Sequence, residues 1–111
     1  MDYSKLSDQE INMAVAEIFH PDSVVIESKS RPPSACITGH LPSKWVDYCN
    51  NPSDAWPIIE KYRISFLYQL TEWCVDVKGA SPVFEANPLR GAMIVFLMMQ
   101  ESANVQDNPS R

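Results

Sequence analysis

The chain has 111 residues, of which 45% are hydrophobic and 21% charged, and its formal net charge is −5 at pH 7. This length holds one hydrophobic core, and the composition is that of an ordinary globular protein. The negative charge and the absence of a run of Lys or Arg argue against general nucleic-acid binding, which requires several neutralised phosphates.

The first predicted helix covers Asp8–Phe19. Ser7 and Glu10 have the spacing of a capping box, in which each side chain accepts a hydrogen bond from the other residue's backbone. Apolar residues at helical spacing are expected to face the core, and they are Ile11, Ala14, Val15, Ile18 and Phe19. The positions expected to face water are Gln9, Asn12 and Glu17.

Two short β-branched or apolar segments follow, and we expect both to be strands. Val24–Glu27 is bounded by turn-forming residues, and Ala35–Thr38 is its expected hairpin partner. From Gly39 to Asn51 no period is sustained, which predicts a long connection and a variable surface region.

A second, short helix is predicted to begin after Ser53-Asp54 and to end near Tyr62. Proline is tolerated in the first turn of a helix, where its missing N–H has no intrahelical acceptor, so we place Pro57 there. Trp56 and Ile59 are the residues expected to point inward.

The next segment has the pattern of a β-hairpin. Residues 64–70 alternate apolar and other side chains, with Ile64, Phe66, Tyr68 and Leu70 on one face. Residues 73–77 repeat the alternation, and 82–85 are a possible edge strand because proline at its start costs no ladder donor.

The last predicted helix opens with Asn87 as cap and Pro88 at its first position, and it continues to Gln100. Its run Ala92–Met99 is apolar on every side, which in a soluble protein requires burial on most faces. Either this is a central helix beneath the sheet, or a second copy of the chain covers one face in a homodimer.

Together these elements predict an α+β fold, with a small antiparallel sheet of three to five strands packed against two or three helices and an apolar C-terminal helix. Residues 1–104 are expected to form a single domain and 105–111 a flexible tail. No apolar run approaches the ~20 residues that span a bilayer, and no signal peptide is evident, so we expect a protein of the cytoplasm without membrane contact.

Candidate chemical groups are few. A metal site would need Cys36, His40, Cys49 and Cys74, of which only the first two approach the spacing of zinc ligands. A nucleophile would need one of the two histidines as base, which leaves an enzyme centred on Cys49 or His40 as the least favoured hypothesis. Three glycines cannot build a phosphate-binding loop, so no cofactor is expected.

An interaction surface is the remaining candidate. Aromatic side chains close to amides and carboxylates are favoured at protein interfaces, and the residues in question are Trp45, Tyr48, Asn50, Asn51, Asp54 and Trp56. The alternative is that the aromatic residues belong to the hydrophobic core, and for Trp56 we prefer this interpretation.

Three stretches of the chain resemble a known family. They are Asp2–Asn12 (DYSKLSDQEIN), Asn50–Ser65 (NNPSDAWPIIEKYRIS) and Asn87–Gln100 (NPLRGAMIVFLMMQ). They look like the NinX-type accessory proteins of lambda-like phages and prophages, a family of unknown biochemical function with no catalytic residue to carry over. Residues 28–48 and 66–85 depart from the pattern expected of that family.

The resemblance, with the lack of catalytic groupings, predicts a phage accessory protein that is not an enzyme and that binds a host or phage protein in the bacterial cytoplasm. A second hypothesis is an acidic mimic of DNA that inhibits a DNA-handling protein, whose binding would weaken steeply with salt.

Overall fold

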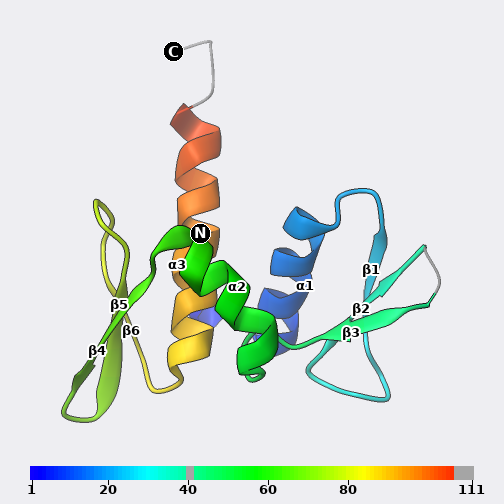
Figure 1. The fold of residues 1–111 in the computed structure, drawn as a ribbon, viewed down its shortest axis with the longest axis horizontal. Coiled ribbons are helices and arrows are strands. Elements are labelled where there is room, and N and C mark those ends of the chain that lie inside the picture. Colours follow the sequence, from blue (N-terminus) through cyan, green and yellow to red (C-terminus); the bar gives the residue numbers. More distant parts are fainter. Residues whose placement is uncertain (40–41, 107–111) are drawn as a thin grey trace.

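The computed structural model describes residues 1–39 and 42–106. The elements in chain order are η1 (Tyr3–Lys5), α1 (Asp8–Phe19), β1 (Val24–Glu27), β2 (Ala35–Thr38), β3 (Lys44–Val46), α2 (Pro52–Tyr62), β4 (Ser65–Gln69), β5 (Glu72–Asp76), β6 (Val83–Glu85) and α3 (Pro88–Gln106). Figure 1 shows a small sheet at each end of the molecule and the helices between them. The predicted α+β class, antiparallel strands and apolar C-terminal helix are confirmed.

Within the described residues, the strands form two separate three-stranded sheets. The first sheet has the order β1-β2-β3 and the second the order β4-β5-β6, and every pair is antiparallel. Both predicted hairpins are present. The prediction of a connection over residues 39–51 is wrong, because Lys44–Val46 adds β3 to the first sheet. Three residues are too few to display the two-residue period by which a strand is recognised.

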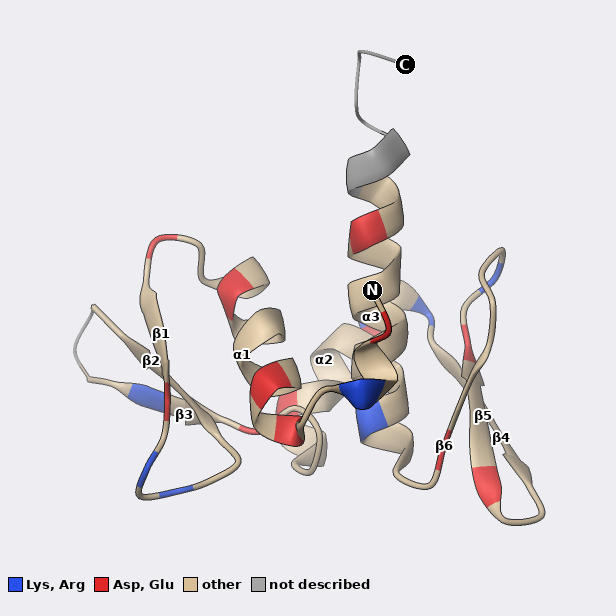
Figure 2. Ribbon diagram, turned by 180° about the vertical axis from the view of Figure 1, so that it is seen from behind, with Lys and Arg blue, Asp and Glu red and all other residues tan. Residues whose placement is uncertain are grey.

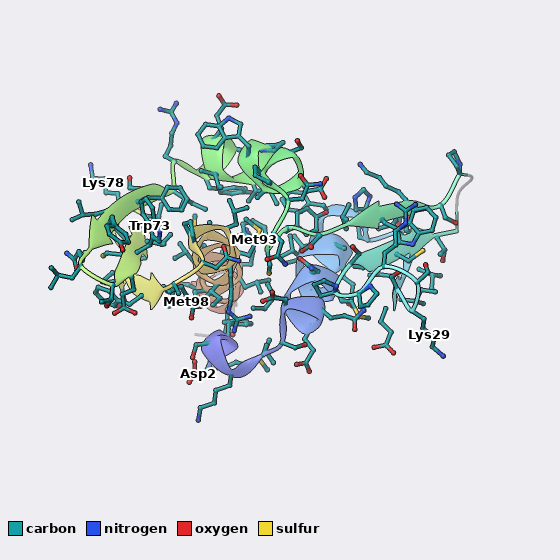
Figure 3. All side chains as sticks on the ribbon, turned by 90° about the horizontal axis from the view of Figure 1, so that it is seen from below. Asp2, Lys29, Trp73, Lys78, Met93 and Met98 are labelled. Carbon is teal, nitrogen blue, oxygen red and sulfur yellow. The ribbon has the colours of Figure 1, made fainter. Side chains whose placement is uncertain are left out.

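The core lies between the two sheets. The helix α1 packs on β1 and β2, whereas α3 packs on β5 and β6 and also contacts α1 and α2. Figure 3 shows Met93 in the middle of the molecule and Trp73 beside the second sheet, with Lys29 and Lys78 toward opposite ends. Met93 is fully buried, and Trp73 is partly buried against the core.

The helix α1 begins and ends where predicted, and both hydrogen bonds of its capping box are present. Its predicted faces are partly wrong. Asn12 is fully buried instead of facing water, and Ile18 is 39% exposed instead of facing the core. A twelve-residue helix packed on a sheet and on a second helix buries a wider sector than its apolar stripe indicates.

The helix α2 begins earlier than predicted. Asn51 is its cap and Pro52 its first residue, so Pro57 lies inside the helix and not in its first turn. The buried face of α2 is formed by Ala55, Ile58 and Ile59. The prediction that Trp56 points inward is wrong, since this side chain is 56% exposed.

The helix α3 has the predicted cap, with the Asn87 side chain accepting from the N–H groups of Leu89 (3.0 Å) and Arg90 (3.4 Å). Residues 91–97 are all buried, so the chain itself accounts for the apolarity that suggested a homodimer through this helix. The helix continues to Gln106, six residues beyond the predicted end, and positions 107–111 of the predicted tail lie outside the described residues.

Within residues 1–39 and 42–106, no helix combines the length and the sustained apolarity that crossing a bilayer requires.

Candidate functional site

The six residues of the predicted interaction surface differ in exposure, and one of them is buried. Tyr48 is 5% exposed and belongs to the core, where burial and the nearby Asp54 carboxylate raise its pKa to about 12. Trp45 on β3 and Trp56 on α2 are 41% and 56% exposed. The structure therefore separates a buried aromatic residue from two exposed ones.

The three polar members of the set stabilise the turn between β3 and α2. Asn51 caps α2 by accepting a hydrogen bond of 2.9 Å from the Ser53 N–H. The Asp54 carboxylate accepts from the Asp47 N–H at 3.0 Å, and Asn50 donates to the Asp47 carboxylate. These contacts give Asn50, Asn51 and Asp54 structural roles.

A buried amide connects this turn to α1 and to the first sheet. The Asn12 side chain donates to the Pro33 carbonyl at 3.0 Å and to the Asp47 carboxylate at 2.9 Å, and it accepts from the Cys49 N–H at 3.1 Å. Every hydrogen-bonding group of this fully buried side chain has a partner, so burial costs it little. Asn12 has a structural role that an exposed polar position would not have.

Arg90, at the start of α3, is the second connection between elements. Its Nη1 lies 2.7 Å from the Asp8 carboxylate on α1, and its Nε lies 3.0 Å from the Glu85 carboxylate on β6. Its Nη2 donates to the carbonyls of Ser4 (2.9 Å) and Leu6 (2.8 Å). One guanidinium thus joins the N-terminal segment, α1, the second sheet and α3.

This role of Arg90 was not recognised from the sequence. A signal was present, because Arg90 is the one charged residue between Asn87 and Gln100 in an otherwise apolar helix. Such a residue either snorkels to solvent or pairs with an acid, and the sequence does not say which acid is near.

Gly91, the residue after Arg90, has a packing role in α3. A Cβ atom at this position would lie 2.8 Å from Cγ2 of Val75 and 3.4 Å from Cβ of Glu85. Val75 is fully buried on β5, the central strand of the second sheet, and its β-branched side chain is restricted at χ1. Gly91 therefore permits the close approach of α3 to β5.

The groups considered for catalysis or metal binding are dispersed. Cys49 is fully buried, and burial raises the pKa of its thiol well above the usual range, which disfavours the reactive thiolate. Cys36 is in the first sheet and Cys74 in the second, and His40 lies outside the described residues. Among residues 1–39 and 42–106, no three His, Cys, Asp or Glu side chains gather as metal ligands would.

The two exposed tryptophans have different surroundings. Trp45 lies on the outer face of the first sheet, directly across from Cys36, and the Arg31 guanidinium is 4.5 Å from its ring centroid. Trp56 takes part in no aromatic pair or cation–π contact within the described part of the chain. Internal packing thus accounts for Trp45 better than for Trp56.

A shallow depression surrounds Trp56, and it is the best candidate functional site. It is lined by Trp56, Ile59, Glu60, Arg63 and Ile64, and we call it the Trp56 surface. Residues 56, 60 and 63 have the spacing of one helix face. Arg63 ends α2 with φ of 56°, and its N–H donates to the carbonyls of Ile59 and Glu60. An exposed indole, a carboxylate and a guanidinium therefore lie on the same side of α2.

A comparison with family models identifies the family of the chain. The model described as "Bacteriophage P22, NinX" matches residues 2–100. The chain belongs to the NinX family. The match covers every element from η1 to most of α3, and it includes residues 28–48 and 66–85, which had been expected to depart from the family pattern. No curated protein and no solved structure shows significant similarity to the chain.

NinX membership makes the chain a phage accessory protein. Several polar residues of the three stretches that carried the resemblance have structural roles, and Asn51, Asp54 and Arg90 are examples. Within these three stretches, Trp56 is the exposed large hydrophobic residue.

Proposed function

We propose that this NinX-family protein acts by binding a host or phage protein through the Trp56 surface. The observation that carries the proposal is a tryptophan that is 56% exposed on a well-formed helix whose aliphatic residues, Ala55, Ile58 and Ile59, are buried. The fold gains little from an indole at this position, whereas a binding partner would gain a large apolar contact.

The composition of the Trp56 surface supports the proposal. Tryptophan and arginine are the residues that most often dominate binding energy at protein interfaces, where truncation of one costs roughly 2 kcal/mol or more. Trp56 supplies apolar area, and Arg63 and Glu60 flank it with opposite charges. This arrangement suits a protein partner with its own apolar centre and mixed polar rim.

The DNA-mimic hypothesis receives less support. Figure 2 shows acidic positions distributed over both sheets, α1 and α3. Several carboxylates are already engaged within the chain, including Asp8 and Glu85 with Arg90, Glu10 in the capping box and Asp54 with the Asp47 N–H. Carboxylates held by internal donors are poor substitutes for a row of free phosphates.

The test is an affinity capture from infected and uninfected bacterial lysate at two salt concentrations, with three forms of the tagged protein. They are the wild type, Trp56→Ala and the control Trp45→Ala, which truncates another exposed tryptophan on a different element. We expect one partner that is retained at both salt concentrations, captured by the wild type and Trp45→Ala, and reduced at least tenfold for Trp56→Ala.

Two results would contradict the proposal. Equal capture by Trp56→Ala and the wild type would remove the Trp56 surface as the binding site. Binding that disappears at the higher salt concentration for all three forms would favour the acidic mimic. Thermal unfolding of each form distinguishes loss of binding from loss of fold, and Trp56→Ala should melt close to the wild type because its side chain is mostly solvated.

A further inference from the structure

In the part of the chain that the structure describes, the two open sheets have four edge strands, and three of them carry the residues that normally prevent pairing with another chain. An edge strand presents unpaired N–H and C=O groups, and proteins protect such edges with charge or proline. The edge strand β1 ends in Glu27 and β3 begins with Lys44. The edge strand β6 follows Pro82 and ends in Glu85.

The remaining edge strand, β4, has no such protection. Residues 64–71 (ISFLYQLT) contain no charged residue, no proline and no glycine. They are rich in the aromatic and β-branched types that favour strands. Leu67 is 60% exposed and Tyr68 56% exposed, and they point to opposite faces of the sheet. Both sides of the β4 edge therefore present apolar surface to solvent.

From these observations we propose that two copies of the chain pair through antiparallel β4 strands, which makes one six-stranded sheet of the two second sheets. The proposal goes beyond the function proposed above and does not depend on it. An antiparallel strand is complementary to a second copy of itself, because a two-fold axis carries residue i onto the partner of residue j and the reverse.

The distribution of charge favours a second copy of the chain as the partner that pairs with the β4 edge. Two molecules with a net charge of −5 repel one another, so they associate best through a strip that carries no charge. In a pairing centred on Leu67, Ser65 faces Gln69 of the second copy and Phe66 faces Tyr68 of the second copy. No like charges are opposed along β4.

The ends of the paired strands add an attraction. Arg63 precedes β4 by two residues, and in the Leu67-centred register it lies beside the hairpin turn of the second copy, where β5 begins with Glu72. The two-fold axis brings opposite charges together at both ends of the pair. On one face of the sheet, Tyr68 of the second copy also joins Phe66 and Trp73, whose rings already contact edge to face with centroids 6.4 Å apart.

The predicted dimer is reversible. A five-residue strand contributes less surface than the ≈ 800 Å² per partner of a standard interface, so we expect a dissociation constant on the order of 10–100 μM. Sedimentation velocity from a few micromolar to about 500 μM should show a mass that rises from 12.6 kDa toward twice that value.

The variant Tyr68→Lys places a charge on the β4 edge, and its matched control is Ile26→Lys, which does the same to an exposed apolar residue of edge strand β1. We expect Tyr68→Lys to remain monomeric at every concentration and Ile26→Lys to associate like the wild type. A wild type that stays monomeric at the highest concentration would overturn the proposal. Equal association of Tyr68→Lys and the wild type would do the same.

Cross-linking tests the register independently of affinity. In a Cys74→Ser background, which removes the cysteine directly across from position 67 on β5, Leu67→Cys should form an intermolecular disulfide. Its Cα atoms in the dimer would be ~5 Å apart, within disulfide range. Gln69→Cys in the same background is the control, because its copies would be ~14 Å apart. Equal cross-linking of the two variants, or none of either, would refute the Leu67-centred pair.

Discussion

Replacement of Arg90 by methionine tests whether one guanidinium joins the two halves of the fold. The Arg90 side chain is 15% exposed, and the carboxylates of Asp8 and Glu85 that it neutralises are 31% and 18% exposed. Methionine has a similar length and keeps most of the apolar packing. It removes four hydrogen bonds and leaves two carboxylates close together without their cation.

Removing one partner of a buried ion pair costs roughly 3–5 kcal/mol, most of it from the charge left unpaired. Because both carboxylates retain some contact with water, we expect the lower end, about 3 kcal/mol. For a domain of this size such a loss lowers Tm by roughly 12 °C, since each kcal/mol corresponds to about 4 °C. Urea unfolding followed by circular dichroism gives the free energy of unfolding, and calorimetry gives Tm.

Three further variants complete the Arg90 experiment. Arg90→Lys keeps the charge but not the planar set of donors, so it should lose about half as much as Arg90→Met. Adding Asp8→Asn and Glu85→Gln to Arg90→Met should recover part of the loss, because the unpaired charges are then absent. Lys5→Met removes an exposed cation and should change stability by less than about 0.5 kcal/mol. A loss in Arg90→Met as small as that of Lys5→Met would refute the account of Arg90.

Two other predictions concern packing and pH. Gly91→Ala should destabilise the fold by about 1–3 kcal/mol despite the higher helix propensity of alanine, because its Cβ would clash with Cγ2 of Val75. In a double-mutant cycle Val75→Ala should reduce this loss, and strictly additive effects of the two substitutions would contradict the explanation. The buried Tyr48 phenol has a pKa raised to about 12, above the value of about 10 in the unfolded chain, so its contribution is complete below pH 10 and is lost as pH rises toward 12. Between pH 10 and 12 the free energy of unfolding should therefore fall more for the wild type than for Tyr48→Phe, by up to about 2–3 kcal/mol. Equal pH dependence of the free energy of unfolding in the two proteins would contradict the raised pKa of Tyr48.

Local signals predicted much of the secondary structure. The capping box of Ser7 and Glu10 and the Asn87-Pro88 opening each act within one turn of helix, so three or four residues are enough to recognise them. The β4–β5 hairpin was recognised from its two-residue period. Leu70 was assigned to the strand face, but it lies in the turn with a φ of 58°. Leucine rarely adopts this conformation, and the local sequence does not indicate it.

The errors arose where the sequence offered two equivalent local solutions. Asn51-Pro52 and Asp54 followed by Pro57 are both plausible helix openings, and the earlier one is used. The choice of the later one shortened the helix at its start. The separate error at Trp56 arose because Trp56 and Ile59 have the spacing of one face, whereas the buried face is the neighbouring sector of Ala55, Ile58 and Ile59. Each strand pairs with its neighbour along the chain, and the two sheets divide where α2 separates β3 from β4. The pattern of a strand does not indicate whether strands before and after a helix join one sheet.

The candidate site was predictable in part. Trp45 and Trp56 are exposed, as an interaction surface requires, whereas Tyr48 is core and Asn50, Asn51 and Asp54 serve the turn before α2. An amide that caps a helix and an amide that binds a partner are the same residue type, so composition alone does not separate them. Only the hydrogen-bond partners distinguish the two roles.

The central claim, that the protein works by binding a partner through α2, is tested most directly by photo-cross-linking in infected cells. A photoreactive phenylalanine derivative replaces Trp56 in one strain and Trp45 in another, and both positions are exposed. The account predicts one discrete covalent product from position 56 during infection and none from position 45. The same product from both positions, or none from position 56, would contradict it.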